Sequence, residues 1–130
     1  MHRSRLSTLL IDTPPQHAAA GAAFWSRALG VRARPAAGEP QFTDLPGAAP
    51  HLVVAVQALQ DTDENSARYH VDVETDDLDA ETGRLLALGA VEVGRWLDCR
   101  TLRAPGGHLL CVIPVHSDPE EFRRHARTWP

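Results

Sequence analysis

Residues 68–90, RYHVDVETDDLDAETGRLLALGA, carry the signals for a strand, a turn and a helix in that order. Polar and apolar side chains alternate over 68–74, which predicts a half-buried strand. The Thr-Asp-Asp sequence at 75–77 then offers side chains that cap helices. Leucines recur at helical spacing over 78–88, and Gly89 is the residue type that most often ends a helix. This stretch therefore predicts a strand that leads directly into a helix.

The first half of the chain repeats this order. A run suited to a strand at 5–11 (RLSTLLI) precedes a proline-containing helix start and an apolar helical pattern over 17–29. Both predicted helices end in Ala-Leu-Gly, 59 positions apart. Each helix is followed by three short extended segments between glycine and proline turns, at 31–34, 41–45 and 51–57, and at 91–96, 99–103 and 108–115. We interpret the chain as a tandem duplication of a βαβββ module, an α+β fold.

The module boundaries follow from this repeat. The prediction is a single domain over 1–130, with module one at about 5–59 and module two at about 68–115. The polar segment 60–67 (QDTDENSA) is the predicted linker between them. A Ser-Asp-Pro-Glu sequence then resembles a capped helix start, which predicts a short C-terminal helix over about 118–129.

Composition limits the possible functional classes. The 130 residues are 43% apolar and 23% charged with a net charge of -4, which suits a globular domain. All 13 basic residues are scattered arginines, whereas phosphate binding needs a clustered positive face, so nucleic acid is not an expected partner. The apolar runs are too short for a membrane span, and two cysteines are too few for a disulfide scaffold. We expect a cytoplasmic protein that binds neither nucleic acid nor membrane.

Several motifs resemble those of the vicinal oxygen chelate superfamily, which includes glyoxalase I, extradiol dioxygenases and bleomycin resistance proteins. The nearest resemblance is to its small glyoxalase-like domains. The matching motifs of the second half are His70-x-Asp72, Asp-Asp-Leu-Asp at 76–79, Leu-Gly-Ala at 88–90, Pro-Gly-Gly at 105–107 and Cys111. Those of the first half are Asp-Thr-Pro-Pro at 12–15, Phe-Trp at 24–25 and Leu-Gly at 29–30. The resemblance implies that the modules form an open-barrel, mostly antiparallel sheet with a ligand in its concavity.

The resemblance also implies where a metal would bind, on the first and last strands of each module. Leu6 occupies the first of these positions, and the last strand of module one, 52–56, is apolar. Module two retains His70 but has Cys111 where glyoxalase I has a glutamate. Two ligands, one of them a thiol, do not suit Mg²⁺, Mn²⁺, iron or nickel, so we expect no metal at this standard site and no cofactor. A rival set drawn from His51, His70, His108 and His116 stays open.

His70 allows two interpretations. It is either a structural histidine bonded across the sheet or a residue of the ligand cleft. Strand alternation places Asp72 and Glu74 on its face and turns the valines between them to the other side. The resemblance favours the cleft. There His70 and Asp72 are the candidate catalytic residues, with Asp72 orienting His70 as a general base, and Glu74 contacts the ligand.

The last hairpin supplies the other candidate ligand contacts. A four-residue turn over 104–107 would place Arg100 opposite Cys111, where Arg100 can bind an anionic group. Cys111 then lines the site or is simply a small buried residue. In this register Cys99 faces the other side, which argues against a disulfide. Trp25 is expected in the cavity wall or in the core.

Two functions from different classes fit these features. One is an enzyme of the glyoxalase-like kind, a lyase or isomerase that works without the standard metal through His70. The other is a non-catalytic protein that binds or sequesters a small molecule, as the bleomycin resistance proteins of the superfamily do. The resemblance adds antibiotic resistance and a homodimer as expectations. The small molecule itself is not identified by the sequence.

Overall fold

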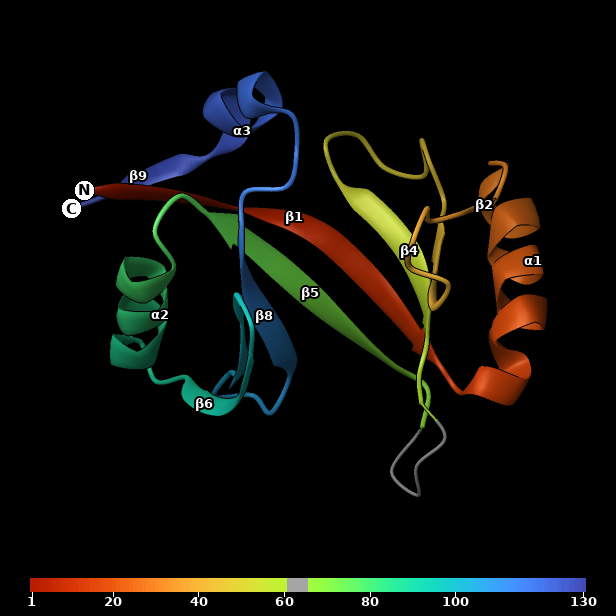
Figure 1. Ribbon diagram of the computed structural model, residues 1–130, viewed down its shortest axis with the longest axis horizontal. Helices are drawn as coiled ribbons and strands as arrows, with labels where there is room; N and C mark the ends of the chain where they lie inside the picture. The colour runs from red at the N-terminus through yellow and green to blue at the C-terminus, as the bar shows by residue number, and fades with distance from the viewer. Residues whose placement is uncertain (61–65) are drawn as a thin grey trace. The chain divides into compact units, whose positions relative to one another are not determined.

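The computed structural model describes residues 1–60 and 66–130 (Figure 1). Most of the predicted linker, 61–65, lies outside the described residues. The chain divides into two compact units. The N-terminal unit is Thr8–Tyr69, and the C-terminal unit consists of Met1–Ser7 and His70–Pro130.

The N-terminal unit contains the first βαβββ series. Strand β1 (His2–Thr13) contributes its second half, and a 3₁₀ turn at Pro15–His17 leads into α1 (Ala18–Leu29). Gly30 ends this helix in the left-handed region at φ 70°, as the sequence predicts. Three strands follow: β2 (Arg34–Pro35), β3 (Phe42–Asp44) and β4 (Val53–Ala58). The strand order is β2-β3-β4-β1, and β4 runs parallel to β1.

A compact apolar core holds this unit together. Ile11 on β1 and Val56 on β4 lie directly opposite each other, and both are at most 8% exposed. Ala22 packs on them from α1, together with Leu45 and Val54. Helix α1 therefore covers one face of the sheet.

The C-terminal unit repeats the series. Its elements are β5 (Arg68–Thr75), α2 (Leu78–Ala87), β6 (Val91–Trp96), β7 (Cys99–Arg103) and β8 (Leu109–Pro114). The order is β6-β7-β8-β5, and β8 runs parallel to β5. Both units thus share one strand order with a parallel first and last strand, while their other module pairs are antiparallel. The predicted α+β fold with tandem βαβββ modules is confirmed, and the described strands do not close into a barrel.

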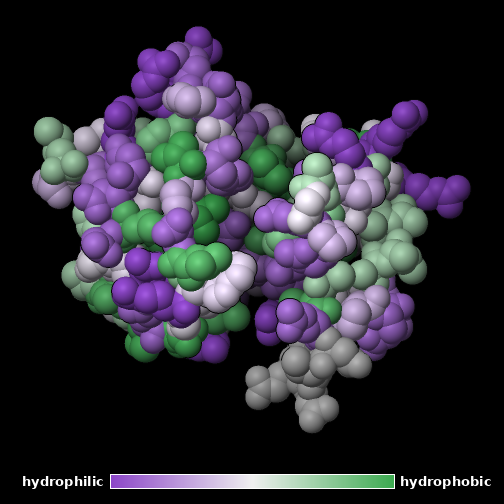
Figure 2. Space-filling model, viewed as in Figure 1, coloured by the Kyte–Doolittle hydropathy of each residue, from purple (hydrophilic) through white to green (hydrophobic). Residues whose placement is uncertain are grey.

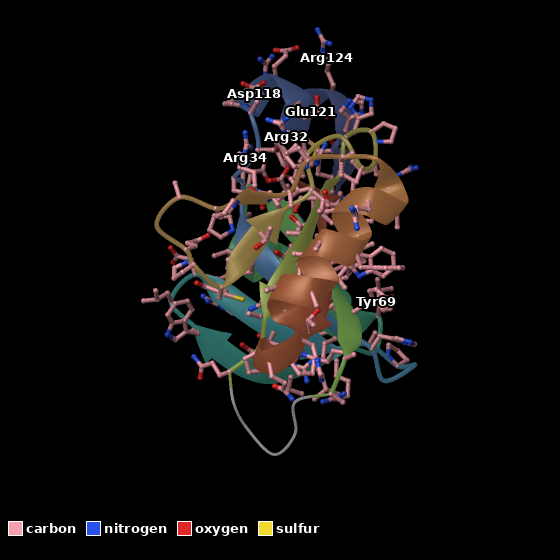
Figure 3. The ribbon with its side chains drawn as sticks, turned by 90° about the vertical axis from the view of Figure 1, so that its right-hand side faces the viewer. Arg32, Arg34, Tyr69, Asp118, Glu121 and Arg124 are labelled. Carbon is pink, nitrogen blue, oxygen red and sulfur yellow. The ribbon has the colours of Figure 1, made fainter. Side chains whose placement is uncertain are left out.

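The helices match their sequence signals. Asp77 caps α2, because its carboxylate accepts a hydrogen bond from the Ala80 amide at 3.0 Å. Asp118, labelled in Figure 3, likewise caps α3 (Pro119–His125) by accepting from the amides of Glu120 and Glu121. Within the described part of the chain, α1 to α3 are all too short or too polar to cross a bilayer.

The C-terminal helix is shorter than predicted. It ends at His125, because Ala126 adopts an extended conformation, and Arg127–Trp129 form strand β9 instead. Strand β9 pairs with the start of β1. The Trp129 indole donates to the Ser4 hydroxyl at 2.8 Å, and the Arg84 guanidinium lies 3.8 Å from the centre of its ring. These contacts stabilise the extended conformation of the last residues. The helical spacing of apolar residues in the sequence could not predict them, because they depend on residues far away in the chain.

Two fully buried glutamates, Glu81 on α2 and Glu74 on β5, bond to segments near the two ends of the chain. The Glu81 carboxylate accepts hydrogen bonds from Ser4 and Arg84 and lies 2.7 Å from the His2 ring. Burial raises the pKa of Glu81, but the hydrogen bonds from Arg84, His2 and Ser4 outweigh it and lower the pKa below its ordinary value.

Glu74, at the end of β5, forms a second network. Its carboxylate accepts from the His116 amide and from the amide and hydroxyl of Ser117, and the Arg5 guanidinium lies 3.0 Å away. Burial raises the pKa of Glu74, but the bonds from Ser117 and His116 more than offset this and leave the pKa lowered. Both carboxylates therefore stabilise the fold in their ionised form.

We predict that acid destabilises the protein through these two groups. A lowered pKa in the folded state contributes stability that is present above the unfolded-state pKa and is lost as pH falls through the folded value. The free energy of unfolding, measured in urea from pH 7 to pH 3, should fall once the pH drops below the ordinary glutamate value of 4.5. Glu74→Gln should lower stability at pH 7 by about 1–3 kcal/mol and flatten this dependence. The exposed Glu39→Gln is the matched control, and an equal pH slope in both variants would contradict the assignment.

Candidate functional site

One face of the C-terminal unit's sheet gathers reactive side chains from three strands. Asp72 on β5 lies opposite Cys111 on β8, and Cys111 lies opposite Thr101 on β7. Side chains two residues apart on a strand share a face, which adds His70 and Cys99. We call this set the thiol face; it consists of His70, Asp72, Cys99, Thr101 and Cys111.

The opposite face of the same strands is apolar at its centre, with Arg100 on the same face near the start of β7. Val73 pairs with Val112 there, and Leu102 pairs with Leu110. Leu102 and Val112 are fully buried. The alternation that the sequence predicts for β5 is therefore present, with polar groups on one side and core residues on the other.

His70, Asp72 and Cys111 form the centre of the thiol face. The His70 Nε2 and Asp72 Oδ1 atoms are 3.7 Å apart, with side chains 13% and 16% exposed. One donor atom from each of the three residues lies within 4.8 Å of the others. The Ser7 hydroxyl on β1 also donates to the Asp72 carbonyl oxygen, which holds this part of β5 in place.

The predicted register of the last hairpin was wrong by one residue. Arg100 lies opposite Val112, and Thr101 instead lies opposite Cys111. Arg103 pairs with Leu109 rather than with His108, and the Ala104 amide donates to the His108 carbonyl, with Gly107 left-handed at φ 94°. A slip by one residue turns every side chain of a strand to the other face.

This shift changes which residues meet. Arg100 does not share the face of Cys111; it donates to the Leu97 carbonyl at 3.0 Å from the other side of β7. Cys99, expected to face away from Cys111, lies with it on the thiol face. Leu102 lies on the same side of β7 as Arg100 and is in the core. The sequence analysis did not predict that Cys99 lies on the thiol face. Only the exact length of the hairpin loop, which sets the register of β7 against β8, could have indicated it.

Two other predicted ligand contacts lie in different surroundings. Glu74 shares the face of Asp72 by alternation, but its carboxylate is fully buried and bonded to Ser117 and the chain before α3. A ligand would have to open that network to reach it. Trp25 packs against the apolar core of the N-terminal unit and meets Phe24 edge-to-face.

The two thiols of the face interact directly. The hydrogen bond between Cys99 and Cys111 lowers the pKa of Cys99 to about 7, against the raising effect of burial, and Thr101 lowers it further. The same bond, together with burial, raises the pKa of Cys111. The Thr101 hydroxyl lies 3.6 Å from the Cys111 sulfur. Cys99 is therefore the thiol that ionises first, and Cys111 donates to it.

The donor atoms decide which metals the thiol face can hold. The superfamily resemblance implies a divalent ion bound by imidazole and carboxylate. The thiol face offers instead one imidazole, one carboxylate and two sulfurs. Hard ions such as Mg²⁺ and Mn²⁺ favour oxygen ligands, so these residues do not fit them.

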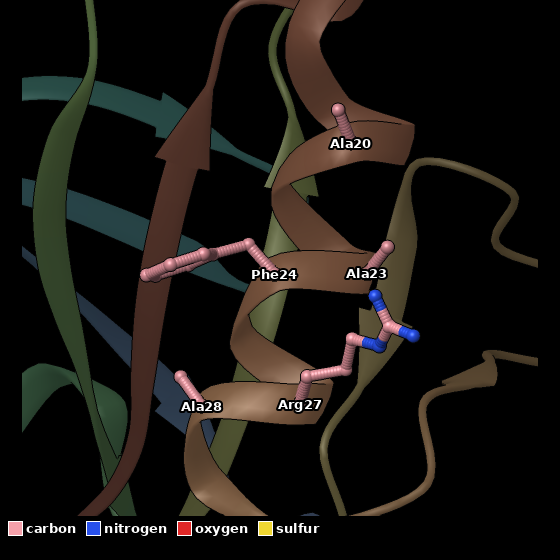
Figure 4. A pocket seen from close by; sticks show the side chains of 5 residues that line it. All are labelled: Ala20, Ala23, Phe24, Arg27 and Ala28. Atoms are coloured by element: carbon pink, nitrogen blue, oxygen red, sulfur yellow. The ribbon is translucent and has the colours of Figure 1, made fainter.

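A hollow lies along α1 in the N-terminal unit (Figure 4). It is lined by Ala20, Ala23, Phe24, Arg27 and Ala28. This lining contains one cation and no histidine, cysteine or carboxylate. On the face drawn in Figure 2, apolar residues lie in small groups between polar ones. The thiol face thus remains the strongest candidate for chemistry.

The sequence and the fold both have known relatives. A model of the family described as glyoxalase-like domain matches residues 8–113. A methylmalonyl-CoA epimerase in complex with methylmalonyl-CoA and NH4+ has a similar fold, with a TM-score of 0.60 and 14% identity over 88% of this chain and 96% of that one. The epimerase from Mycobacterium tuberculosis gives a TM-score of 0.52 and 17% identity over 85% and 87%.

A structure described as an NAD-dependent benzaldehyde dehydrogenase from Legionella pneumophila is also similar. Its TM-score is 0.57, with 13% identity over 83% of this chain and 97% of that one. At these identities the likeness concerns the fold alone. No curated protein matches the sequence significantly.

The interaction between the thiols predicts their reactivity. In reduced, chelator-treated protein, alkylation of Cys99 by iodoacetamide should rise through a midpoint near pH 7. Cys111→Ala removes the donor, so the midpoint should move toward the ordinary thiol value of about 8.5. Alkylation is followed by mass spectrometry of the peptide that contains Cys99, with Cys99→Ala as the control. An unchanged midpoint in Cys111→Ala would show that the two thiols do not interact.

Proposed function

Because the chain belongs to the glyoxalase-like domain family, we propose that it binds a small molecule on the thiol face. The observation that carries this proposal is the pair His70 and Asp72, which lies half-buried on the polar face of the sheet, opposite the face that carries the buried Leu102 and Val112. Half-buried polar groups beside apolar surface are typical of small-molecule sites, where they fix the orientation of a ligand.

The pair suits proton transfer. An imidazole can accept a proton from a carbon next to a carbonyl group, and a neighbouring carboxylate stabilises the imidazolium that forms. The Asp72 carboxylate lies close enough to His70 for this role. The corresponding activity is that of a lyase or isomerase in which His70 is the base and Asp72 the positioning residue. The reaction removes a proton to His70 and returns it to the same or a neighbouring atom.

A second candidate function is binding without catalysis. Arg100, the cation expected to bind an anionic group of the substrate, lies on the other side of β7. A developing oxyanion therefore lacks that partner on the thiol face. The net charge of -4 and the carboxylate of Asp72 favour a cationic ligand in this case. Sequestration of such a ligand, with the homodimer and the resistance role expected from the resemblance, belongs to this alternative, and the cytoplasmic location expected from composition suits either function.

His70→Ala distinguishes these functions from a purely structural histidine. With dihydroxyacetone as the probe, chelator-treated wild-type protein should speed exchange of the carbon-bound hydrogens with D₂O, followed by proton NMR. His70→Ala should reduce this rate by about 10²-fold or more, because general-base catalysis contributes about 10²–10⁴-fold. Its free energy of unfolding should change by less than about 1 kcal/mol, because a half-buried site residue leaves few core contacts behind.

The exposed His108, on the loop of the last hairpin, provides the matched control. His108→Ala should leave both exchange and stability unchanged. A His70→Ala protein that is destabilised by about 1–3 kcal/mol and exchanges hydrogens at the wild-type rate would identify His70 as structural. Binding of dihydroxyacetone without exchange in wild-type protein would favour the non-catalytic function.

A further inference from the structure

We propose that the outer edge of strand β6 is the surface on which two copies of this chain associate. The occupant of this edge is the β6 strand of a second copy, which runs antiparallel to the first across a twofold axis. The resemblance implies a homodimer without indicating a surface, and the evidence for this surface comes from β6 itself. The proposal does not rest on the proposed function, because β6 takes no part in the proton-transfer scheme.

Strand β6, labelled in Figure 1, is the outermost strand of the C-terminal unit. It pairs with β7 on one side and ends the strand order of the described residues, so its other side presents an outer edge. Trp96 is 74% exposed and Val91 is 61% exposed. Other large apolar side chains on or beside this strand are also exposed: Leu88, Val93 and Leu97. An exposed apolar edge favours pairing with another strand, which charged residues or proline would discourage.

A β-bulge decides which side chains of β6 share a face. The register with β7 shifts by one residue after Glu92, so Val93 is the extra residue. In a regular strand, Val91 and Trp96 would point to opposite faces, because they are five positions apart. The bulge instead puts both on the thiol face. Glu92 and Arg95 share the other face, where the Arg95 guanidinium donates to the Glu92 carboxylate at 2.9 Å.

This bulge makes β6 complementary to itself. When the bulges of two antiparallel copies face each other on the twofold axis, Glu92 lies opposite the partner's Arg95. Val91 then lies opposite the partner's Trp96. The members of each pair share a face, as directly opposed residues in a sheet must, and symmetry repeats each contact. Pairs of opposite charge and pairs of an aromatic with a β-branched residue are the cross-strand contacts that stabilise antiparallel sheets.

The bulge also favours a second copy over an unrelated extended segment. A regular strand that pairs with β6 before the bulge falls out of register by one residue after it. A second copy carries the same bulge and stays in register along the whole strand. The association is closed, because the twofold axis covers the β6 edges of both copies and leaves neither for a third.

The dimer connects the two thiol faces. A twofold axis perpendicular to the sheet leaves both of them on the same side of one continuous sheet. Trp96, which lies opposite Cys99 on β7, then stands between the thiol face of its own chain and the partner's Val91. Self-association through β6 therefore adds an apolar border to the thiol face.

The test measures self-association of the full chain by sedimentation equilibrium, and we expect a monomer–dimer equilibrium. Trp96→Ser should weaken association by about 10-fold or more, because a tryptophan buried at an interface is a typical hot spot. Glu92→Arg and Arg95→Glu should each weaken it by about 10-fold or more, because each places like charges opposite each other. Phe24→Ser on α1 and Glu39→Arg, both at exposed positions of the N-terminal unit, are the matched controls and should associate like the wild type.

An equimolar mixture of the Glu92→Arg and Arg95→Glu chains provides the sharpest measurement. One chain carries two cations at these positions and the other carries two carboxylates, so every charged contact in the mixed dimer is attractive. Native mass spectrometry distinguishes the mixed dimer from both homodimers by mass, and we expect the mixed dimer to predominate. Each chain keeps its like charges within itself, so recovered association reports on contacts between chains. Circular dichroism of each variant verifies that it is folded.

Three results would overturn the proposal. The first is a wild-type chain that stays monomeric at about 1 mM, a concentration at which even a weak dimer forms. The second is a dimer that neither Trp96→Ser nor the two charge reversals weaken. The third is a mixture of the two charge variants that associates no better than either alone. A dimer that Phe24→Ser weakens and Trp96→Ser leaves unchanged would assign the interface to α1 instead of β6.

Discussion

The parallel pairing of β5 with β8 is the constraint on which the rest of the C-terminal unit depends. It places Asp72 beside Cys111 and, one residue later, Val73 beside Val112. Because side chains alternate, this one register separates a polar face from an apolar core. A slip of one residue would press the carboxylate and the thiol into the core and expose the valines, at a cost of several buried apolar side chains. The stability of the core and the assembly of the thiol face therefore have the same cause.

Local signals made the order of elements predictable. The leucine spacing before Gly89 and the alternation around His70 each depend on neighbours along the chain, and both correspond to the observed α2 and β5. The hairpin register was not predictable in this way, because it depends on whether the loop closes at Ala104 with His108 or one residue earlier. That single residue decides whether Arg100 or Cys99 shares a face with Cys111. The sequence therefore predicted three residues of the thiol face, His70, Asp72 and Cys111. It did not predict the two residues that β7 contributes, Cys99 and Thr101.

The roles of the two buried glutamates, Glu74 and Glu81, could not be predicted from the sequence either. Glu74 looks like a ligand contact because it follows His70 and Asp72 at strand spacing. Its partners come from a segment 42 and 43 positions away, and those of Glu81 include His2, 79 positions away. Alternation gives the face of a residue but not what covers that face. The ionised carboxylates instead bond to segments near the two chain ends: Glu81 to His2 and Ser4, and Glu74 to His116 and Ser117.

The two modules share a topology but differ in the side chains on their parallel pair of strands, which is β1 with β4 in one module and β5 with β8 in the other. In the N-terminal unit, the parallel pair β1 and β4 brings Leu10 opposite Ala55 and Ile11 opposite Val56, all of them buried and apolar. In the C-terminal unit the corresponding parallel pair, β5 and β8, brings Asp72 opposite Cys111. A duplicated module can thus keep its packing in one copy while the other acquires donor groups, provided that a third strand supplies their partners. Strand β7 does so through Thr101 and Cys99, which lie within the same unit. The reactive face is completed by its own hairpin, and its chemistry follows from the length of that hairpin's loop.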